Sequence, residues 1–548
     1  MATDAKQLHE SKAVLPNHIV SVGPDMQPNS EDVERIADGL AQVRITQTAR
    51  SIMAASEAAL SQMISEERCI YGVTTGYGPL AGTHVSPRCS DVLQHNLIYH
   101  LATGVGPALS WRKARAIVFA RLQALSQGYS AVSDAVVDRL VACLNAGLAP
   151  VIPEKGTVGA SGDLTPLSHL ALALIGEGAW MDRHGPVSND AAFSRMEFDR
   201  LPLGPKEGLA LVNGTSAMTG IAALNGALAS RLVKLGCILS LVNAEVFSGH
   251  RAAWHPLVGA ARGQPGQQRV HDFLWALANQ ADRLQDFEPL PPKLMALEDV
   301  NQHQELPQDP YSIRCVPQLL GASLDMLEMH NDVVARELSA VTDNPLIFAE
   351  EGTLIHAGNF FGQHVAFASD ALLNAVTMVA VLMERQIARI TDVRQSEGLP
   401  AFLQGNQTGL HSGFMGAQVT ASALVAEMRS KATPASIQSI PTNANNQDVV
   451  TMGTIAARKT SDVLEDVMRV VSIKALCVAQ AMDLQRLDRF SKAAKALHGF
   501  VRSSSPFLHE DRPLSGEIEG LATQFSDPKI LEIIYADLPS VKDHLAQF

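Results

Sequence analysis

The stretch GTVGASGDLTPLSHLALALIGEG, from Gly156 to Gly178, combines two features that seldom occur together. Its first residues contain three glycines, which is typical of a tight turn, yet the residues after Asp163 have the apolar spacing of a helix. Asp163 can cap a helix and Pro166 fits a first helical turn, so we expect a helix to begin here. The Ala160-Ser161-Gly162 segment would then precede a helix amino terminus, where backbone N–H groups favour negative charge. Taken alone, the stretch also fits an ordinary glycine turn before a buried helix.

The composition and charge limit the class of protein. The chain has 548 residues, of which 46% are hydrophobic and 18% charged, so a large core can form. The net charge of −13 disfavours nucleic acid or an anionic membrane as the main partner. The amino-terminal residues, MATDAKQLHESKAVLP, lack the apolar core of a secretory signal, and the six cysteines include no CxxC pair. We therefore expect a cytoplasmic protein with reduced thiols.

Five long stretches carry apolar residues at helical spacing with few breakers. They are Thr215–Ser248, Gln318–Val341, His364–Ile390, Ser412–Ser430 and Val450–Leu484. Helices of this length that are apolar on more than one side must pack against several neighbours. The most apolar run, residues 365–383, is interrupted by Asp370 and Asn374, which favours a buried helix over a membrane span.

The predicted fold class is mainly α-helical. Residues 1–212 predict a smaller mixed amino-terminal domain, with short helices and turns rich in glycine and proline. Residues 213–548 predict a long-helix bundle core followed by carboxy-terminal helices. The long segments have no fixed period between them, which disfavours a helical repeat array.

Several common catalytic motifs are absent from the sequence. There is no GxxxxGK[ST] phosphate loop, no GxGxxG fingerprint, no HExxH and no Cys/His cluster with zinc spacing. The GASGD segment is not a nucleophile elbow, because Asp163 stands where the second glycine should be. These absences disfavour a hydrolase, an NTPase, a dehydrogenase or a metalloenzyme, and we expect no metal site.

Seven segments, in the same order along the chain, resemble motifs of the aromatic amino acid ammonia-lyase family. That family includes histidine, phenylalanine and tyrosine ammonia-lyases and related aminomutases. The segments are CIYGVTTGYGPLAG (69–82), GTVGASGDLTPLSHLAL (156–172), LVNGTSAM (211–218), QDPYSIRCVPQ (308–318), TDNPL (342–346), GNFFGQH (358–364) and NANNQDVVTMG (443–453). The resemblance covers nearly the whole chain and implies a homotetramer in which each active site is shared between subunits.

The resemblance also implies a prosthetic group made from the chain itself, with no external cofactor. In the family, an Ala-Ser-Gly tripeptide cyclises and loses water to become a methylidene-imidazolone. Carried over, the nitrogen of Gly162 would attack the carbonyl of Ala160, and Ser161 would supply the methylidene carbon. A side chain at position 162 would obstruct this cyclisation. The product is an electrophile, which the amino-terminal domain would carry together with a catalytic tyrosine loop.

Further residues receive roles from the same resemblance. Tyr71 corresponds to the base that removes the β-proton of the substrate, and Tyr311 to a second essential tyrosine. Arg314 corresponds to the partner of the substrate carboxylate, for which a guanidinium fork is well suited. Asn213 corresponds to an asparagine beside the electrophile. The remaining positions expected near the pocket are Gln308, Asn344, Phe360 and Gln447.

The ring-recognition position is the pair His100-Leu101 in LQHNLIYHLATGVG. Tyrosine lyases resemble this His-Leu pair, whereas many phenylalanine lyases carry Phe-Leu and histidine lyases typically carry Ser-His. A histidine here can hydrogen-bond a para-hydroxyl, and losing that partner costs about 1–3 kcal/mol. Gln447 stands where histidine lyases carry a glutamate, which argues against histidine as substrate. A structural histidine near a helix end is the open alternative for His100.

We therefore predict a carbon–nitrogen lyase that eliminates ammonia from L-tyrosine to give p-coumarate, with slower action on L-phenylalanine. The alternatives are a tyrosine or phenylalanine 2,3-aminomutase, a phenylalanine- or histidine-preferring lyase, and a non-catalytic helical assembly protein. The last alternative predicts disruption of the tripeptide, Tyr71 or Arg314, and all are intact. Tyr77, where the family more often has phenylalanine, has no role assigned by the resemblance.

Overall fold

The structure is a computed structural model that describes residues 18–286 and 308–548. Contacts within these residues divide the chain into two compact units. The first unit contains the described residues up to Leu224, together with Val333–Ala366 and Ser436–Ile455. The second unit contains the described residues of Asn225–Asp332, Phe367–Ala435 and Ala456–Phe548. Each unit is therefore built from segments that lie far apart in the sequence.

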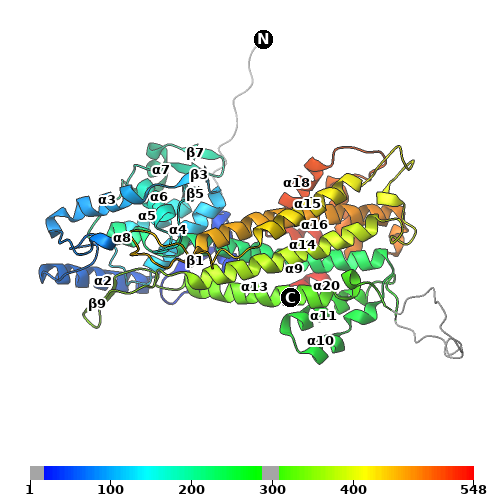
Figure 1. The fold of residues 1–548 in the computed structure, drawn as a ribbon, viewed down its shortest axis with the longest axis horizontal. Helices are drawn as coiled ribbons and strands as arrows, with labels where there is room; N and C mark the ends of the chain where they lie inside the picture. The colour runs from blue at the N-terminus through cyan, green and yellow to red at the C-terminus, as the bar shows by residue number, and fades with distance from the viewer. Residues whose placement is uncertain (1–17, 287–307) are drawn as a thin grey trace, which may run out of the picture. The chain divides into compact units, whose positions relative to one another are not determined.

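The first unit is a mixture of short helices and very short strands (Figure 1). Its helices are α1 (Ser30–Ala37), α2 (Gln47–Ser65), α3 (Ser90–Leu101), α4 (Trp111–Leu125), α5 (Asp134–Asn145), α6 (Leu164–Leu174), α7 (Asn189–Met196) and α8 (Glu207–Val212), with 3-10 turns η1 (Gly78–Leu80) and η2 (Pro87–Cys89). Its strands are β1 (Ile19–Val22), β2 (Gln42–Ile45), β3 (Val105–Ala108), β4 (Ala149–Pro150), β5 (Pro153–Lys155), β6 (Trp180–Asp182), β7 (Gly185–Val187), β8 (Leu346–Phe348) and β9 (Thr353–Ile355).

The strands of the first unit form four small sheets. β1 and β2 pair in parallel, with Ile19 opposite Gln42, and the remaining pairs are antiparallel: β3 with β5, β4 with β6, β6 with β7, and β8 with β9. Helix α4 passes among these elements and is buried from Ala114 to Leu125. Its start is fixed by Ser110, whose hydroxyl accepts the Lys113 N–H at 3.3 Å. The unit is thus organised around buried helices, which include α4, α6 and α8, rather than around a sheet.

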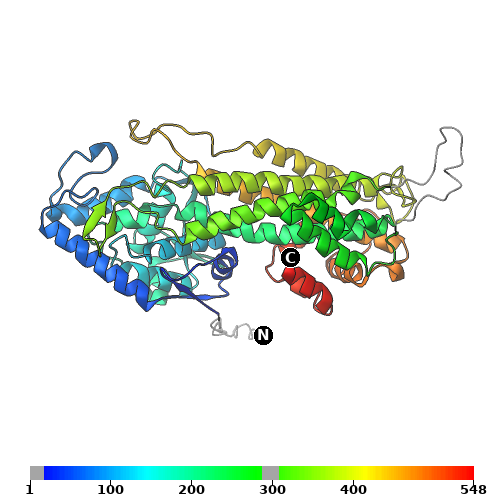
Figure 2. The ribbon, with the colours of Figure 1, turned by 90° about the horizontal axis from the view of Figure 1, so that it is seen from below.

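The second unit contains the long helices (Figures 1 and 2). They are α9 (Ser216–Val246), α13 (Val316–Leu338), α14 (Gln363–Thr391), α15 (Met415–Lys431) and α16 (Gly453–Leu484); all but α15 have one end in the first unit. The shorter elements are η3 (Arg251–Trp254), α10 (Pro256–Arg262), α11 (Pro265–Ala278), α12 (Tyr311–Arg314), η5 (Ala401–Leu403), η6 (Leu487–Arg489), α17 (Lys492–Ser504), α18 (Ser515–Phe525), α19 (Ile530–Ile534) and α20 (Pro539–Gln547). All five long helices predicted from apolar spacing are confirmed, and the mainly α-helical fold class with them.

The core of the second unit explains why its helices are apolar on several sides. One buried cluster runs through α9, α11, α13, α14, α15 and α16 and on into the carboxy-terminal helices. Two helices, α9 and α14, are long and apolar enough to cross a membrane, but 83% and 72% of their apolar windows are buried inside the protein. Asp370, which interrupts the apolar run of α14, is also buried. The apolarity of these helices is accounted for by packing.

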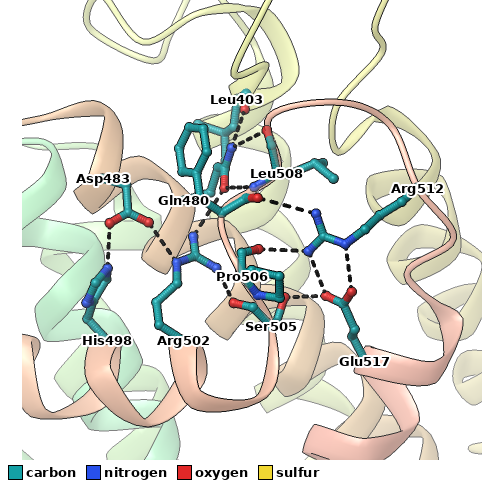
Figure 3. Close-up of polar contacts among 11 residues, drawn as sticks. Leu403, Gln480, Asp483, His498, Arg502, Ser505, Pro506, Leu508, Arg512 and Glu517 are labelled. Atoms are coloured by element: carbon teal, nitrogen blue, oxygen red, sulfur yellow. Dashed lines mark hydrogen bonds and ion pairs between the residues drawn. The ribbon is translucent and has the colours of Figure 1, made fainter.

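A polar network fixes the chain after α17 to α16 (Figure 3). The Gln480 side chain accepts hydrogen bonds from Arg502 at 3.1 Å and from the Leu508 backbone at 3.0 Å. Its amide nitrogen donates to the carbonyls of Leu403 and Leu508 at 3.2 and 3.1 Å. Asp483, on the same helix, accepts from Arg502 at 2.7 Å. The polar atoms of Gln480 thus have partners on η5, on α17 and in the loop after α17.

Two ionisable side chains lie fully buried on α16. The ammonium of Lys474 donates a hydrogen bond to Asn243 on α9. Burial lowers the pKa of Lys474 from its ordinary value of 10.5 to about 7. Burial also raises the pKa of the neighbouring Cys477 thiol to about 12. All six cysteines of the protein are free.

Lys474 makes the stability of the second unit depend on pH. The unfolded chain protonates this lysine below about pH 10.5, but the folded protein does so only below about pH 7. Between these values unfolding takes up a proton, so stability rises with pH by about 1.4 kcal/mol per pH unit. We expect the thermal midpoint of the wild type to rise relative to Lys474→Met between pH 7 and pH 9. The exposed Lys492→Met is the control, and parallel profiles for all three proteins would contradict the prediction.

Candidate active site

The Ala160-Ser161-Gly162 segment forms a turn immediately before α6. Gly162 has a left-handed φ of +66°, and it pairs with Gly214 in a parallel bridge. A Cβ atom at position 162 would lie 2.2 Å from the Gly214 carbonyl oxygen. The same oxygen accepts the Asp163 N–H at 2.7 Å. Glycine is therefore required at position 162 both by its backbone angle and by this close approach.

A second contact holds the turn on its amino-terminal side. Gly159 also has a left-handed φ, of +72°, and its carbonyl accepts the Thr451 hydroxyl at 3.0 Å. The Met452 N–H donates to the Val158 carbonyl at 2.9 Å. The turn is thus clamped between Gly214 and the segment that leads into α16.

Asp163 follows the turn and is fully buried. Its carboxylate makes no capping bond to α6; it accepts the Met218 N–H at 2.8 Å, in the first turn of α9, and the Thr454 hydroxyl. Burial raises the pKa of Asp163 to about 6, against the opposing effect of these hydrogen bonds. The expectation that Asp163 caps α6 is therefore wrong. Its backbone is not in the extended conformation of most capping residues, and the side chain caps α9 instead.

Tyr71 lies in the glycine-rich loop between α2 and η1. Its backbone N–H donates to His356 Nε2 at 3.2 Å, and the two rings meet edge to face at 6.4 Å between centroids. Its hydroxyl oxygen accepts the Gly78 N–H at 2.8 Å, at the first residue of η1. Because the oxygen is an acceptor in this contact, its own proton points elsewhere.

Tyr77, the residue without an assigned role, braces this loop. Its hydroxyl donates to the Gly72 carbonyl at 3.3 Å, and the Gln94 amide donates to the same carbonyl at 2.9 Å. Burial, together with the neighbouring Tyr71, raises the pKa of Tyr77 above its ordinary value. Tyr77 is therefore a protonated donor, and of the two tyrosines only Tyr71 presents its oxygen as an acceptor of a backbone N–H.

Asn213 and Asn344 belong to one buried cluster. The Asn213 amide donates to Asp343 at 3.1 Å and to the Asn344 carbonyl at 3.2 Å. Asp343 forms a buried ion pair with Lys206 at 2.5 Å. The Asn344 side-chain oxygen accepts the Ala357 N–H at 2.7 Å, next to the histidine that binds the Tyr71 backbone. Through Asn344 and His356, these contacts connect Asn213 to the loop that carries Tyr71.

His100 and Leu101 are the last two residues of α3, which packs against α6 and α8. The His100 ring is exposed, and its Nδ1 lies 3.0 Å from the Asn96 carbonyl, so Nε2 remains for another partner. Gln94, on the same helix, bonds Gly72 in the Tyr71 loop. The selectivity candidate is thus carried on a helix that is tied directly to that loop.

Phe360 and Gln447 also lie in the first unit. Phe360 is half-buried in the turn before α14. The Gln447 side chain accepts the Thr442 hydroxyl at 2.8 Å, which closes a short loop. Within that loop, Asn443 lies against Gly78: a Cβ at Gly78 would be 2.7 Å from the Asn443 amide. The loop of Gln447 therefore contacts the loop of Tyr71.

The three remaining candidates lie together in the second unit. The Arg314 guanidinium stacks over the Tyr311 ring, 4.8 Å from its centroid, and Arg314 also bonds Gln308. Tyr311 is 71% exposed, while the Nε atom of Arg314 is buried without a hydrogen-bond partner among the described residues. This cluster is a cation with a spare donor beside an exposed aromatic ring.

Several residues of the site were missed by reasoning from the sequence. Lys206 and His356 lie outside the quoted motifs, and Asp343 lies inside TDNPL but received no role. Arg121, fully buried on α4 beside Gly214, was also missed. A signal was present for Arg121, because an arginine in the apolar run AIVFARLQAL requires a buried partner.

A cavity of about 500 Å³ lies elsewhere, in the second unit. It is lined by Gly413, Gly416, Ala417, Thr420, Leu424, Asp466, Arg469, Arg512, Leu514, Ser515, Ile518 and Glu519. None of the predicted site residues lines it, and its arginines are paired with carboxylates of the same unit. It is therefore separate from the candidate site.

Comparison with known proteins decides the family. The sequence profile described as aromatic amino acid lyase matches residues 29–503. The chain is 46% identical over 505 residues to the tyrosine ammonia-lyase of Cereibacter sphaeroides, covering 91% of this chain and 96% of that protein. The chain belongs to the aromatic amino acid lyase family. It is accordingly a carbon–nitrogen lyase.

Other members of the family are also similar to this lyase. The histidine ammonia-lyase of Symbiobacterium thermophilum is 39% identical, with coverage of 92% of this chain and 96% of that protein. The crystal structure of tyrosine aminomutase from Streptomyces globisporus has a TM-score of 0.89 and is 38% identical, covering 94% of this chain and 99% of that one. The lyase thus shares its fold with enzymes whose names specify different substrates and products.

The close approach at Gly162 can be measured separately from its backbone angle. Gly147 has a similar φ, +70°, but no atom within 4 Å of an added Cβ. In a Ser161→Ala background, which cannot form the methylidene group, Gly147→Ala should cost about 1–2 kcal/mol in unfolding free energy. Gly162→Ala should cost about 1–3 kcal/mol more, because its Cβ meets the Gly214 backbone. Equal unfolding midpoints in urea for the two variants would contradict the close approach.

Proposed function

We propose that the lyase eliminates ammonia from L-tyrosine to give p-coumarate, with slower action on L-phenylalanine. The observation that supports tyrosine as the substrate is the position of His100 at the end of α3. Its ring is exposed and its Nδ1 faces the Asn96 carbonyl, so Nε2 can pair with a para-hydroxyl. Leu101 beside it would contact the apolar ring. The similarity to a tyrosine ammonia-lyase supports the same assignment.

The Ala160-Ser161-Gly162 turn fits a methylidene-imidazolone. Gly162 has no room for a side chain, and Gly159 and Gly162 allow the left-handed bend. Such a group supplies an electrophile that makes the substrate nitrogen a better leaving group. The chain itself holds the turn in place through Gly214 and Thr451.

The remaining residues bind the substrate and move its proton. Tyr71 is the proposed base for the β-proton; its oxygen is held by the Gly78 N–H. Arg314 is the proposed partner of the substrate carboxylate, since its buried Nε has a spare donor. Tyr311 is the second proposed catalytic tyrosine, and Asn213 the proposed asparagine beside the electrophile. Residues proposed to line the pocket are Gln308, Asn344, Phe360 and Gln447.

The proposed assembly is a cytoplasmic homotetramer with shared active sites. Apolar side chains that the single chain leaves exposed support it. They include Met326 and Met329 on α13, Phe367 and Met378 on α14, and Met415 and Val419 on α15. In this proposal residues 1–212 form the domain with the electrophile and the tyrosine loop, and residues 213–548 form the helical core.

A tyrosine 2,3-aminomutase is the second candidate function, supported by the similarity to the Streptomyces globisporus enzyme. It would use the same residues but return ammonia to the β-carbon. Histidine is disfavoured as substrate, because Gln447 is neutral where a cationic imidazole would be better served by a carboxylate.

A product assay with an intact-mass measurement tests the proposal. Purified protein given L-tyrosine, L-phenylalanine or L-histidine should form coumarate rapidly, cinnamate slowly and no urocanate, and its mass should lack the water lost by the tripeptide. Ser161→Ala cannot lose the water that the serine hydroxyl supplies, and it should lose nearly all turnover because no electrophile can form. Ser168→Ala, which loses only a bond to the Thr165 carbonyl, is the control. Dominant urocanate or β-tyrosine would refute the proposed reaction.

The substrate preference can be tested at His100. In His100→Phe the nitrogen that would pair with the para-hydroxyl is gone, so the preference for tyrosine over phenylalanine should fall by about 1–3 kcal/mol, or roughly 5- to 150-fold. The ratio of kcat/KM values for the two amino acids measures this change. His95→Phe, on the same helix, removes a histidine that pairs with Asp91 and should leave the ratio unchanged. An unchanged ratio in His100→Phe would place ring recognition elsewhere.

A further inference from the structure

Two fully buried arginines lie on α4, and they differ in how their donors are used. Arg115 donates to carbonyls on several sides: to Ile36 at 2.7 Å, to Leu144 at 2.9 Å and to Leu148 at 3.1 Å. All three guanidinium nitrogens of Arg115 donate hydrogen bonds. Arg115 therefore has a complete structural role, joining α4 to the ends of α1 and α5.

Arg121 has no such set of partners. One of its terminal nitrogens, Nη2, donates to the Ala210 carbonyl, but Nε and Nη1 are buried without a hydrogen-bond partner in the described residues. Burial lowers the pKa of Arg121 to about 10, while Asp343 and Asp163 act in the opposite direction, so the group remains a cation at neutral pH. A buried cation with unused donors lowers the stability of the fold, so its presence calls for an explanation other than stability.

The position of these unused donors is informative. A Cβ added at Gly214 would lie 2.2 Å from Arg121 Nη1, and a Cβ added at Gly162 would lie 2.2 Å from the Gly214 carbonyl oxygen. Gly214 is therefore the single layer of backbone between the guanidinium and the Ala160-Ser161-Gly162 turn. The first contact excludes a side chain at Gly214 and the second excludes one at Gly162. The φ of Gly214, +153°, is also one that glycine adopts most readily.

We propose that Arg121 is a positioning residue for the Ala160-Ser161-Gly162 turn: it supports Gly214 from behind and so keeps Gly162 in the bend from which the turn cyclises. This inference rests on the proposed function. In the cyclisation, the Gly162 nitrogen bonds to the Ala160 carbonyl carbon, and the Ala160 oxygen leaves as water with the amide protons of Gly162 and Ser161. The Ser161 hydroxyl leaves as a second water with the proton of its own Cα. Arg121 exchanges no atoms in these steps.

The charge and the shape of the guanidinium both enter this role. One arm of the fork donates to the Ala210 carbonyl and the other lies against Gly214 without a hydrogen bond to the described residues, so the guanidinium fills the space between the end of α8 and Gly214. A lysine would keep the charge but could not span both groups. A methionine would fill part of the space and remove both the charge and the donors. The three side chains therefore form a graded series at one position.

The test is the intact mass of folded protein, isolated first by size exclusion, for the wild type, Arg121→Met, Arg121→Lys and Arg115→Met. We expect Arg121→Met to lose water from the tripeptide about tenfold more slowly, or more slowly still, with Arg121→Lys in between. Arg115→Met should lower the thermal midpoint but show the full mass deficit, because Arg115 does not touch the turn. This readout reports the tripeptide directly and does not depend on turnover.

The outcomes separate this inference from the proposed function. A full mass deficit in folded Arg121→Met would overturn the role of Arg121 and leave the proposed function intact. If Arg121→Met does not fold, wild-type dehydration in Arg121→Lys overturns it equally. Absence of any mass deficit in the wild type would refute the electrophile itself, and with it the proposed function.

Discussion

Gly162 lies against Gly214 so closely that no side chain fits between the two backbones. The organisation of the first unit around the turn follows from this contact. With Gly162 fixed, Asp163 is placed where its N–H reaches the Gly214 carbonyl and its carboxylate reaches the start of α9. Asn213, one residue before the contact, is held by Asp343 and the Asn344 carbonyl. Two glycines thus bring together segments that are distant in the sequence, because they allow backbone to pack directly on backbone.

The ionisable groups around this contact are buried and opposed in sign. Lys206 pairs with Asp343, Arg121 is a cation behind Gly214, and Asp163 is a carboxyl whose pKa burial raises. Such groups contribute little to net stability, since the cost of removing charges from water offsets their attraction. Their value lies in position: a charge in a low-dielectric interior acts strongly on a neighbouring group that gains or loses charge. The polar interior of the first unit therefore serves to fix the position of the Ala160-Ser161-Gly162 turn more than to add net stability.

Local patterns in the sequence predicted the long helices and the glycine turn, and non-local contacts limited the rest. The five long helices were predictable because apolar periodicity is a property of neighbouring residues. The site motifs were found through a family resemblance, which identifies the residues along the chain but not their positions in the fold. The capping of α9 by Asp163, the ion pair of Lys206 with Asp343 and the pairing of β3 with β5 each join residues whose proximity only the folded chain creates. The orphan donors of Arg121 could not be recognised before its neighbours were known.

The structure gives a role to Tyr77, one of the two tyrosines of the glycine-rich loop. In the sequence, Tyr77 is a departure from the phenylalanine that the family more often carries. In the folded chain its hydroxyl donates to Gly72, which the Gln94 amide also binds. The loop therefore carries one more internal bond than a phenylalanine would allow, and Tyr71 is held by a firmer support. A mutase must retain the intermediate until ammonia returns to it, whereas a lyase releases it, so we expect the mobility of this loop to bear on the proposed choice between coumarate and β-tyrosine.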